Sequence, residues 1–90
     1  MRRVHILISG YVHGVGFRYY VLEKAQKLNL LGWVKNNLEG SVEVDAQGEE
    51  HNIDAFIDLC RKGPPLSHIK DIYIREELIT KEFKDFKVRF

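Results

Sequence analysis

The sequence contains few of the features that mark secreted, membrane-spanning or nucleic-acid-binding proteins. It has one cysteine among 90 residues, so no disulfide bond can form within the chain, and we expect a reducing, cytoplasmic environment. No apolar run approaches the roughly 20 residues of a membrane helix, and the start of the chain lacks the continuous apolar core of a signal peptide. The chain has fourteen Lys and Arg residues and thirteen Asp and Glu residues, so its charges nearly balance. This balance argues against a protein that binds nucleic acid or a membrane surface mainly by electrostatic attraction. We therefore expect residues 1–90 to form one soluble domain.

What is present is a pattern of apolar residues that predicts both strands and helices. Alternating or turn-flanked apolar runs are typical of strands, and five segments have them: residues 3–11, 31–36, 41–47, 69–75 and 86–90. Apolar residues recur at helical spacing from Val21 to Leu28, which predicts a helix of about ten residues that ends at Asn29. A second helix is expected over residues 50–62, where Gly63-Pro64-Pro65 stops it.

The order of these segments is β-α-β-β-α-β, followed by a short terminal strand. Both expected helices are apolar on one side only, and the two long strands each have one polar face. Two helices that cover one face of an antiparallel sheet satisfy both patterns. The sequence therefore predicts a ferredoxin-like α+β sandwich, with an antiparallel sheet, two helices on one face and a short C-terminal strand.

A glycine-rich stretch joins the first strand to the first helix: Gly10-Tyr11-Val12-His13-Gly14-Val15-Gly16-Phe17-Arg18. Glycines allow successive backbone N–H groups to turn toward one point, and a helix start adds partial positive charge, so such a stretch can cradle a phosphate. Arg18 can grip two phosphate oxygens with its forked guanidinium. Tyr19 excludes two better-known phosphate loops, because one requires Ser or Thr near that point and the other a third glycine. The alternative is an ordinary glycine-rich turn beside a surface arginine.

Asn36 closes the strand at residues 31–36, just before a turn at residues 37–40. One interpretation is an Asx turn, in which the side chain bonds to the backbone two residues further on. The other is a functional role, in which the amide orients a water molecule or a substrate. The residues alone leave both interpretations open.

These two stretches resemble the two signatures of the acylphosphatase family. The first family pattern is an apolar residue, any residue, Gly, any, Val, Gln, Gly, Val, any, Phe, Arg, and residues 8–18 match it except that His13 replaces Gln. The second is Gly-aromatic-Val-Lys-Asn, three residues, Gly, any, Val, five residues and Gly, and residues 32–48 match it throughout. The resemblance extends to the chain length and the order of the elements, so it implies a free-standing acylphosphatase.

The resemblance implies hydrolysis of the carboxyl-phosphate anhydride bond of small acylphosphates, with inorganic phosphate as product and no metal or cofactor. It further implies that Arg18 and Asn36 are catalytic, that Asn36 positions the attacking water, and that the enzyme is a monomer. The residues implied to bind the phosphate are His13, Gly14, Val15, Gly16, Phe17 and Arg18. So few residues are chemically sufficient, because a carboxylate is a good leaving group and phosphoryl transfer depends mainly on positioning and charge stabilisation.

Other reactive or aromatic side chains are expected to have structural roles. Neutral His13 offers one hydrogen-bond donor and one acceptor, so we expect it to support the loop in place of Gln rather than act as an acid or base. Cys60 lies on the apolar stripe of the second helix, which predicts a buried core thiol rather than a nucleophile. The other histidines share no metal-ligand spacing, so no metal site is expected: His5, His51 and His68. Four aromatic residues are expected to pack in the core or the site wall: Phe17, Tyr19, Tyr20 and Trp33.

Two alternatives of different classes remain. A ferredoxin-like domain that binds single-stranded RNA needs aromatic residues on its central strands, whereas residues 41–46 contain two acids and no aromatic. A domain that senses phosphate or acylphosphate without turnover would share the same loop. Phosphate release would distinguish this sensor from the enzyme.

Overall fold

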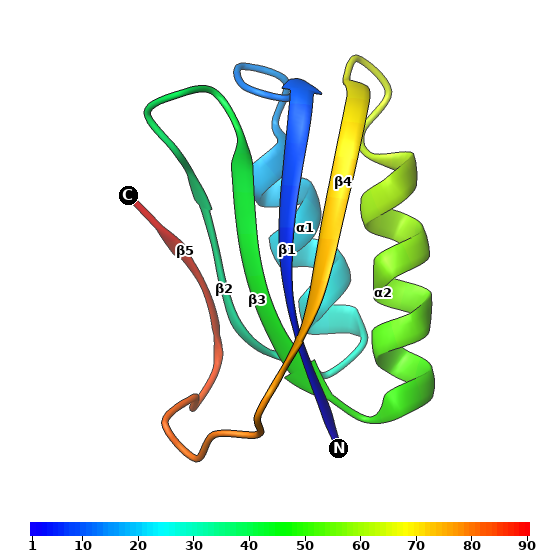
Figure 1. Ribbon diagram of the computed structural model, residues 1–90, viewed down its shortest axis with the longest axis vertical. Coiled ribbons are helices and arrows are strands. Elements are labelled where there is room, and N and C mark those ends of the chain that lie inside the picture. Colours follow the sequence, from blue (N-terminus) through cyan, green and yellow to red (C-terminus); the bar gives the residue numbers. More distant parts are fainter.

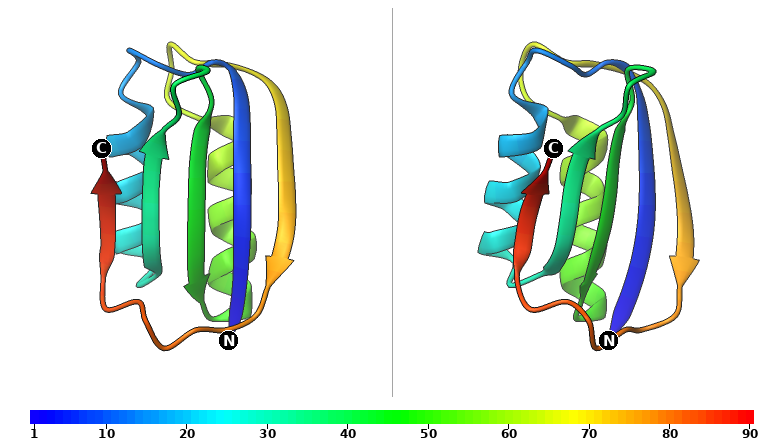
Figure 2. Two further views of the ribbon diagram at one scale, coloured as in Figure 1. Left: turned by 60° about the vertical axis from the view of Figure 1, so that its left-hand side comes forward. Right: turned by 90° about the vertical axis from the view of Figure 1, so that its left-hand side faces the viewer.

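The computed structural model describes residues 1–90, and its elements follow the predicted order. They are β1 (Arg2–Tyr11), α1 (Phe17–Lys27), β2 (Leu31–Asn36), β3 (Val42–Gly48), α2 (Glu50–Lys62), β4 (His68–Glu77) and β5 (Phe86–Arg89). The strands form one five-stranded sheet in the order β4-β1-β3-β2-β5, and both helices cover the same face of it (Figures 1 and 2). The ferredoxin-like α+β prediction is therefore confirmed. With 11 and 13 residues, both helices fall short of the length needed to cross a membrane.

The terminal strand makes the sheet mixed rather than purely antiparallel. The pairs β1–β3, β1–β4 and β2–β3 are antiparallel, as expected, whereas β5 pairs with β2 in parallel. Residues 78–85 run from one edge of the sheet to the other, along the end that is opposite the loop between β1 and α1 (Figure 2). The strand β5 therefore starts at the same end of the sheet as β2. The alternation in residues 86–90 predicted a strand but could not reveal this direction.

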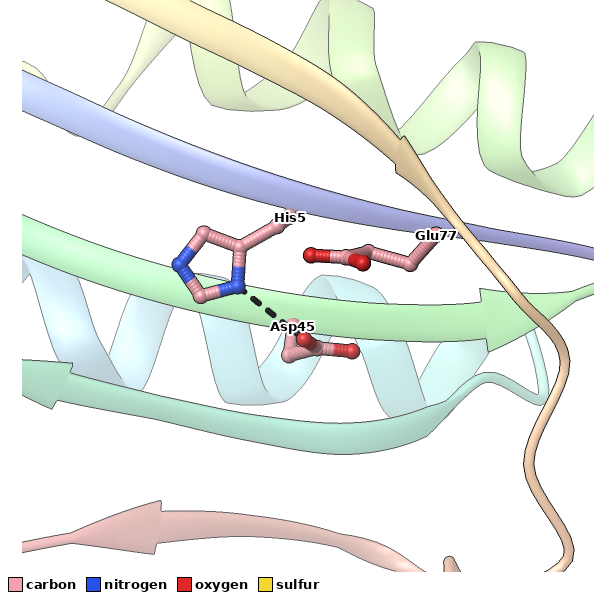
Figure 3. Close-up of side chains that lie close together, drawn as sticks. All are labelled: His5, Asp45 and Glu77. Carbon is pink, nitrogen blue, oxygen red and sulfur yellow. Dashed lines mark hydrogen bonds and ion pairs between the residues drawn. The ribbon is translucent and has the colours of Figure 1, made fainter.

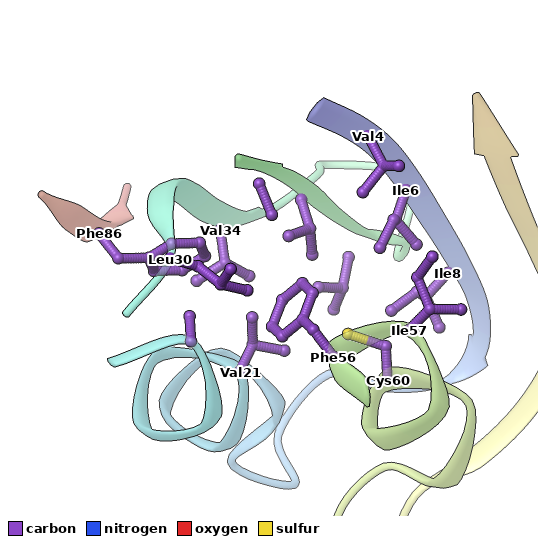
Figure 4. Close-up of a cluster of buried hydrophobic side chains, with 14 of the residues drawn as sticks. Val4, Ile6, Ile8, Val21, Leu30, Val34, Phe56, Ile57, Cys60 and Phe86 are labelled. Carbon is purple, nitrogen blue, oxygen red and sulfur yellow. The ribbon is translucent and has the colours of Figure 1, made fainter. Parts of the chain in front are cut away.

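The core lies between the sheet and the two helices (Figure 4). Val4, Ile6 and Ile8 alternate toward it from β1, while Val21 of α1 and Phe56 of α2 enter it from the helices. Cys60 is part of this cluster, and its burial raises the pKa of the thiol to about 12. The expectation of an unreactive core thiol is thereby supported, because the reactive thiolate is strongly disfavoured.

Two backbone positions explain where α1 ends and how β2 approaches β3. α1 ends at Lys27, and Asn29, two residues later, has φ 56°, a left-handed conformation that prevents the helix from continuing. Gly32 has φ 138°, and a Cβ at this position would lie 1.8 Å from the carbonyl oxygen of Asp45 on β3. Only glycine allows so close an approach, so residue 32 is needed for β2, which ends in Asn36, to pair closely with β3.

Candidate active site

The glycine-rich loop places the N-terminus of α1 at the end of β1. Gly14 and Gly16 have φ values of 71° and 76°, so the chain turns sharply and enters the helix at Phe17. No side chain caps this helix, and its first turn contains no acidic residue. Because the first N–H groups of a helix have no acceptor within it, they remain free to bind an anion.

A cavity of about 170 Å³ lies between this loop, the first turn of α1 and the end of β2. It brings together five of the residues expected in the site: Gly14, Gly16, Phe17, Arg18 and Asn36. Tyr19, which was expected in the core or the site wall, also lines it, as does Val12, which was not among the residues expected there. The other two expected residues lie apart, since His13 turns toward Ser41 and Val15 packs against the hydrophobic core.

Asn36 is the most informative residue of the cavity. Its Oδ1 atom is buried and has no hydrogen-bond partner among the protein's own groups. An Asx turn would require that oxygen to accept a bond, so this interpretation is wrong. The turn is instead bonded by Asn37, whose N–H donates to the Ser41 carbonyl at 2.9 Å and whose Nδ2 donates to the Ser41 hydroxyl at 2.9 Å. Since an unpaired buried acceptor costs free energy, Asn36 is best explained by a ligand or water in the cavity.

Arg18 is available to an anion because no carboxylate in the chain forms an ion pair with it. Its guanidinium carbon lies 5.0 Å from the centre of the Phe90 ring. The ring can hold the guanidinium by a cation–π contact without neutralising its charge. Sequence reasoning did not identify Phe90, because nothing in the linear sequence indicates that β5 ends beside the first turn of α1.

His13 connects the loop to the turn after β2. Its Nε2 atom lies 2.8 Å from the Ser41 carbonyl oxygen, and because a carbonyl only accepts, this nitrogen carries the hydrogen. The Ser41 hydroxyl in turn donates to the carboxylate of Glu39, a bond that lowers the pKa of Glu39 below its ordinary value. His13 thus bonds the loop to the neighbouring turn and does not itself line the cavity.

A second group of polar side chains lies on the open face of the sheet (Figure 3). His5 meets Asp45 and Glu77 there, which the sequence could not show because the three residues come from β1, β3 and β4. His5 lies 3.0 Å from Asp45 through Nδ1 and 2.7 Å from Glu43 through Nε2. Arg3 donates to Asp45 at 2.8 Å, and Arg75 donates to Glu77 at 2.8 Å. Each group already has a partner in the chain, so the cluster is satisfied without a cation.

A larger concavity, about 700 Å³, also lies on this open face and is lined by residues that include Leu7, Glu43, Tyr73 and Arg75. It does not include Arg18 or Asn36, and Glu43 lies on the central strand β3. A carboxylate on a central strand repels nucleic-acid phosphates and offers no ring on which an RNA base could stack. The open face therefore does not favour the RNA-binding alternative.

The chain is similar to known proteins in both sequence and structure. Residues 4–88 match the family model described as Acylphosphatase. A protein of Methylococcus capsulatus named acylphosphatase is 43% identical over 88 residues, which are 98% of this chain and 96% of that protein. The crystal structure of acylphosphatase from Bacillus subtilis superposes with a TM-score of 0.96 at 37% identity, covering 100% of both chains. The structure of an acylphosphatase from Coxiella burnetii gives a TM-score of 0.91 at 38% identity, covering 98% of this chain and 92% of that one.

Proposed function

The chain belongs to the acylphosphatase family, and from that premise we propose that the cavity between Arg18 and Asn36 binds and hydrolyses its acylphosphate substrate. The family is one of hydrolases that need no metal, so the protein's own groups must supply the catalysis. The observation that carries the assignment is the buried, unpartnered Oδ1 of Asn36 in a cavity that also contains Arg18 and the start of α1.

The phosphate group occupies the loop side of the cavity. Backbone N–H groups of residues 13–18 donate to its oxygens, and the uncapped start of α1 adds partial positive charge. The Arg18 guanidinium donates to two oxygens at once, as its forked geometry allows. Because these donors are held before substrate arrives, they stabilise the charge that shifts onto the peripheral oxygens during phosphoryl transfer.

Asn36 holds the nucleophile. Its Oδ1 accepts a hydrogen bond from a water molecule, and this directs a lone pair of the water oxygen toward phosphorus. The water oxygen bonds to phosphorus while the bond to the carboxyl oxygen breaks and its electron pair leaves with the carboxylate. Both hydrogens of the water remain on the released phosphate, so the step needs no side-chain base.

The biological setting is part of the same proposal. The enzyme is proposed to act as a monomer. The only cysteine is buried and reduced in the core, which suits a cytoplasmic enzyme. The proposed substrates are small acylphosphates, and inorganic phosphate is the product.

Hydrolysis of benzoyl phosphate in excess EDTA tests the proposal. Arg18→Ala should lower kcat/KM by about 100- to 1000-fold, the usual loss when one preorganised donor is removed. Asn36→Ala should lower kcat while the KM changes little, since the water is oriented mainly in the transition state. An Arg18→Ala enzyme of near-normal rate would contradict the assignment. A wild-type protein that binds phosphate without releasing it from the substrate would instead be the sensor.

A further inference from the structure

We infer that Tyr19 contacts the acyl group of the substrate and makes the enzyme favour acylphosphates with a flat, apolar acyl group. This inference rests on the proposed function, because it requires the phosphate to bind at the start of α1. Tyr19 lines the same cavity as Asn36, yet its side chain is 60% exposed. The phosphate-binding groups already described do not explain an exposed aromatic ring at this position.

The neighbours of Tyr19 on α1 establish which way it faces. Phe17 and Val21 are buried against the sheet, and the Tyr20 hydroxyl donates to the Leu59 carbonyl of α2 at 2.9 Å. The Arg18 side chain points toward neither of these partners but toward Phe90, next to the end of β5. Successive residues of a helix are rotated by about 100°, so Tyr19 takes the remaining direction, away from the sheet.

The side chain of Tyr19 also lies near the mouth of the cavity along the helix axis. The Cα–Cβ bonds of an α-helix tilt toward its N-terminus, and long side chains cover the turn that precedes them. Tyr19 stands in the first turn of α1, so its ring lies beside the N-terminal end where the phosphate is proposed to bind. Asn36 borders the same cavity from the sheet side, at the end of β2.

The stereochemistry of phosphoryl transfer relates the position of Tyr19 to that of Asn36 across the cavity. The attacking and leaving oxygens lie roughly in line on opposite sides of phosphorus. Asn36 holds the water on the sheet side, so the bond to the carboxylate points to the opposite side, where Tyr19 stands. The acyl group therefore leaves past the Tyr19 ring, and an aromatic ring stacks best on another flat apolar group.

The experiment compares kcat/KM for benzoyl phosphate and acetyl phosphate, which differ only in the acyl group. Tyr19→Ala is expected to lower the benzoyl-to-acetyl ratio of kcat/KM by about three- to tenfold, the range for one aromatic contact. Tyr19→Phe should restore the ratio, because the ring and not the hydroxyl makes the contact. Tyr73→Ala is the matched control, since Tyr73 is equally exposed, at 60%, but lies on β4 away from the cavity.

The inhibition constant of inorganic phosphate separates acyl recognition from damage to the loop. It should be the same in Tyr19→Ala and the wild-type enzyme. An unchanged benzoyl-to-acetyl ratio would overturn the inference, as would an equal fall for both substrates together with weaker phosphate inhibition. If the wild-type protein hydrolyses neither substrate, the proposed function itself is contradicted. That result is seen in the wild type alone, so it is distinct from a failure of the inference about Tyr19.

Discussion

His13 Nε2 donates a hydrogen bond of 2.8 Å to the carbonyl oxygen of Ser41. This bond joins the loop before α1 to the turn after β2, and the candidate site lies between these two segments. His13 stands where the family signature has Gln, whose amide can donate a bond of the same kind. The substitution therefore preserves the donor while the chemistry of the side chain changes.

The first prediction concerns this bond. His13→Ala should raise the KM for benzoyl phosphate about tenfold, because the loop loses the equivalent of one hydrogen bond, roughly 1–1.5 kcal/mol. His13→Gln should keep most of the wild-type affinity by donating to the same carbonyl. Steady-state kinetics of both variants check this. Equal KM values in the wild type and His13→Ala would show that the bond does not hold the loop.

The second prediction concerns the Phe90 ring. Phe90→Ala should raise the KM about two- to fivefold, because an exposed cation–π contact contributes about 0.5–1 kcal/mol to holding Arg18. Phe83→Ala is the matched control, since that ring packs on Arg3 at 5.2 Å, outside the cavity. If the two variants have the same KM, the ring does not position Arg18.

The third prediction concerns acid stability at the turn after β2. The hydrogen bond from the Ser41 hydroxyl lowers the pKa of Glu39 below its ordinary value of 4.5. A carboxylate with a lowered folded-state pKa contributes stability above the unfolded-state value, and this stability is lost as the pH falls through the folded-state value. The wild type should therefore be more stable than Glu39→Gln at pH 7, and the difference should shrink below about pH 4.5.

Urea unfolding of both proteins between pH 7 and pH 3 provides the measurement. The comparison with Glu39→Gln is necessary because Glu76, whose pKa is lowered by its bonds to Arg2, also loses its ion pair in acid. A constant difference between the two unfolding midpoints across this range would mean that Glu39 does not contribute through its charge.

The fourth prediction concerns the buried carboxylate on the open face of the sheet. The Asp45 side chain is 3% exposed and accepts bonds from Arg3 and His5. Asp45→Ala should lower the free energy of unfolding by about 2–4 kcal/mol, because it leaves a partly buried arginine without its partner. Asp54→Ala should cost less than about 1 kcal/mol, since that side chain is 66% exposed beside Arg2.

Urea unfolding and benzoyl phosphate hydrolysis should be measured on both Asp variants. At a temperature where both remain folded, each should keep the wild-type kcat, because neither residue borders the cavity. Equal stability of the two variants would argue that the Arg3–Asp45 pair contributes no more than a surface ion pair.

The fold could be predicted because its signals are local. Alternation in residues 41–47 requires one buried face, and the apolar stripe of residues 50–62 requires a helix with one buried side. The second helix has the predicted bounds, because Gly63 and the following prolines cannot continue it. The loop before α1 could be placed for the same reason, since glycine spacing and a helix start are adjacent in the chain.

The features that could not be predicted depend on which strands lie side by side. The parallel pairing of β5 with β2, and hence the contact of Phe90 with Arg18, follows from the path of residues 78–85 around the sheet. The meeting of His5 with Asp45 follows from the β1–β3 register. The sequence also left the role of Asn36 open, because only the folded structure shows that its neighbour Asn37 bonds the turn.

The place of β1 between β3 and β4 in the sheet has a consequence for how the chain folds. Ile6 pairs with Val44 on one side and with Ile74 on the other, so each partner is distant in the sequence. Closing such long loops costs entropy before any pairing repays it, and domains rich in distant contacts fold in milliseconds to seconds rather than microseconds. During synthesis, β1 can therefore complete its pairing only after β4 has been made, by which point most of the chain has been synthesised. The sheet that supports the loop before α1 forms only then.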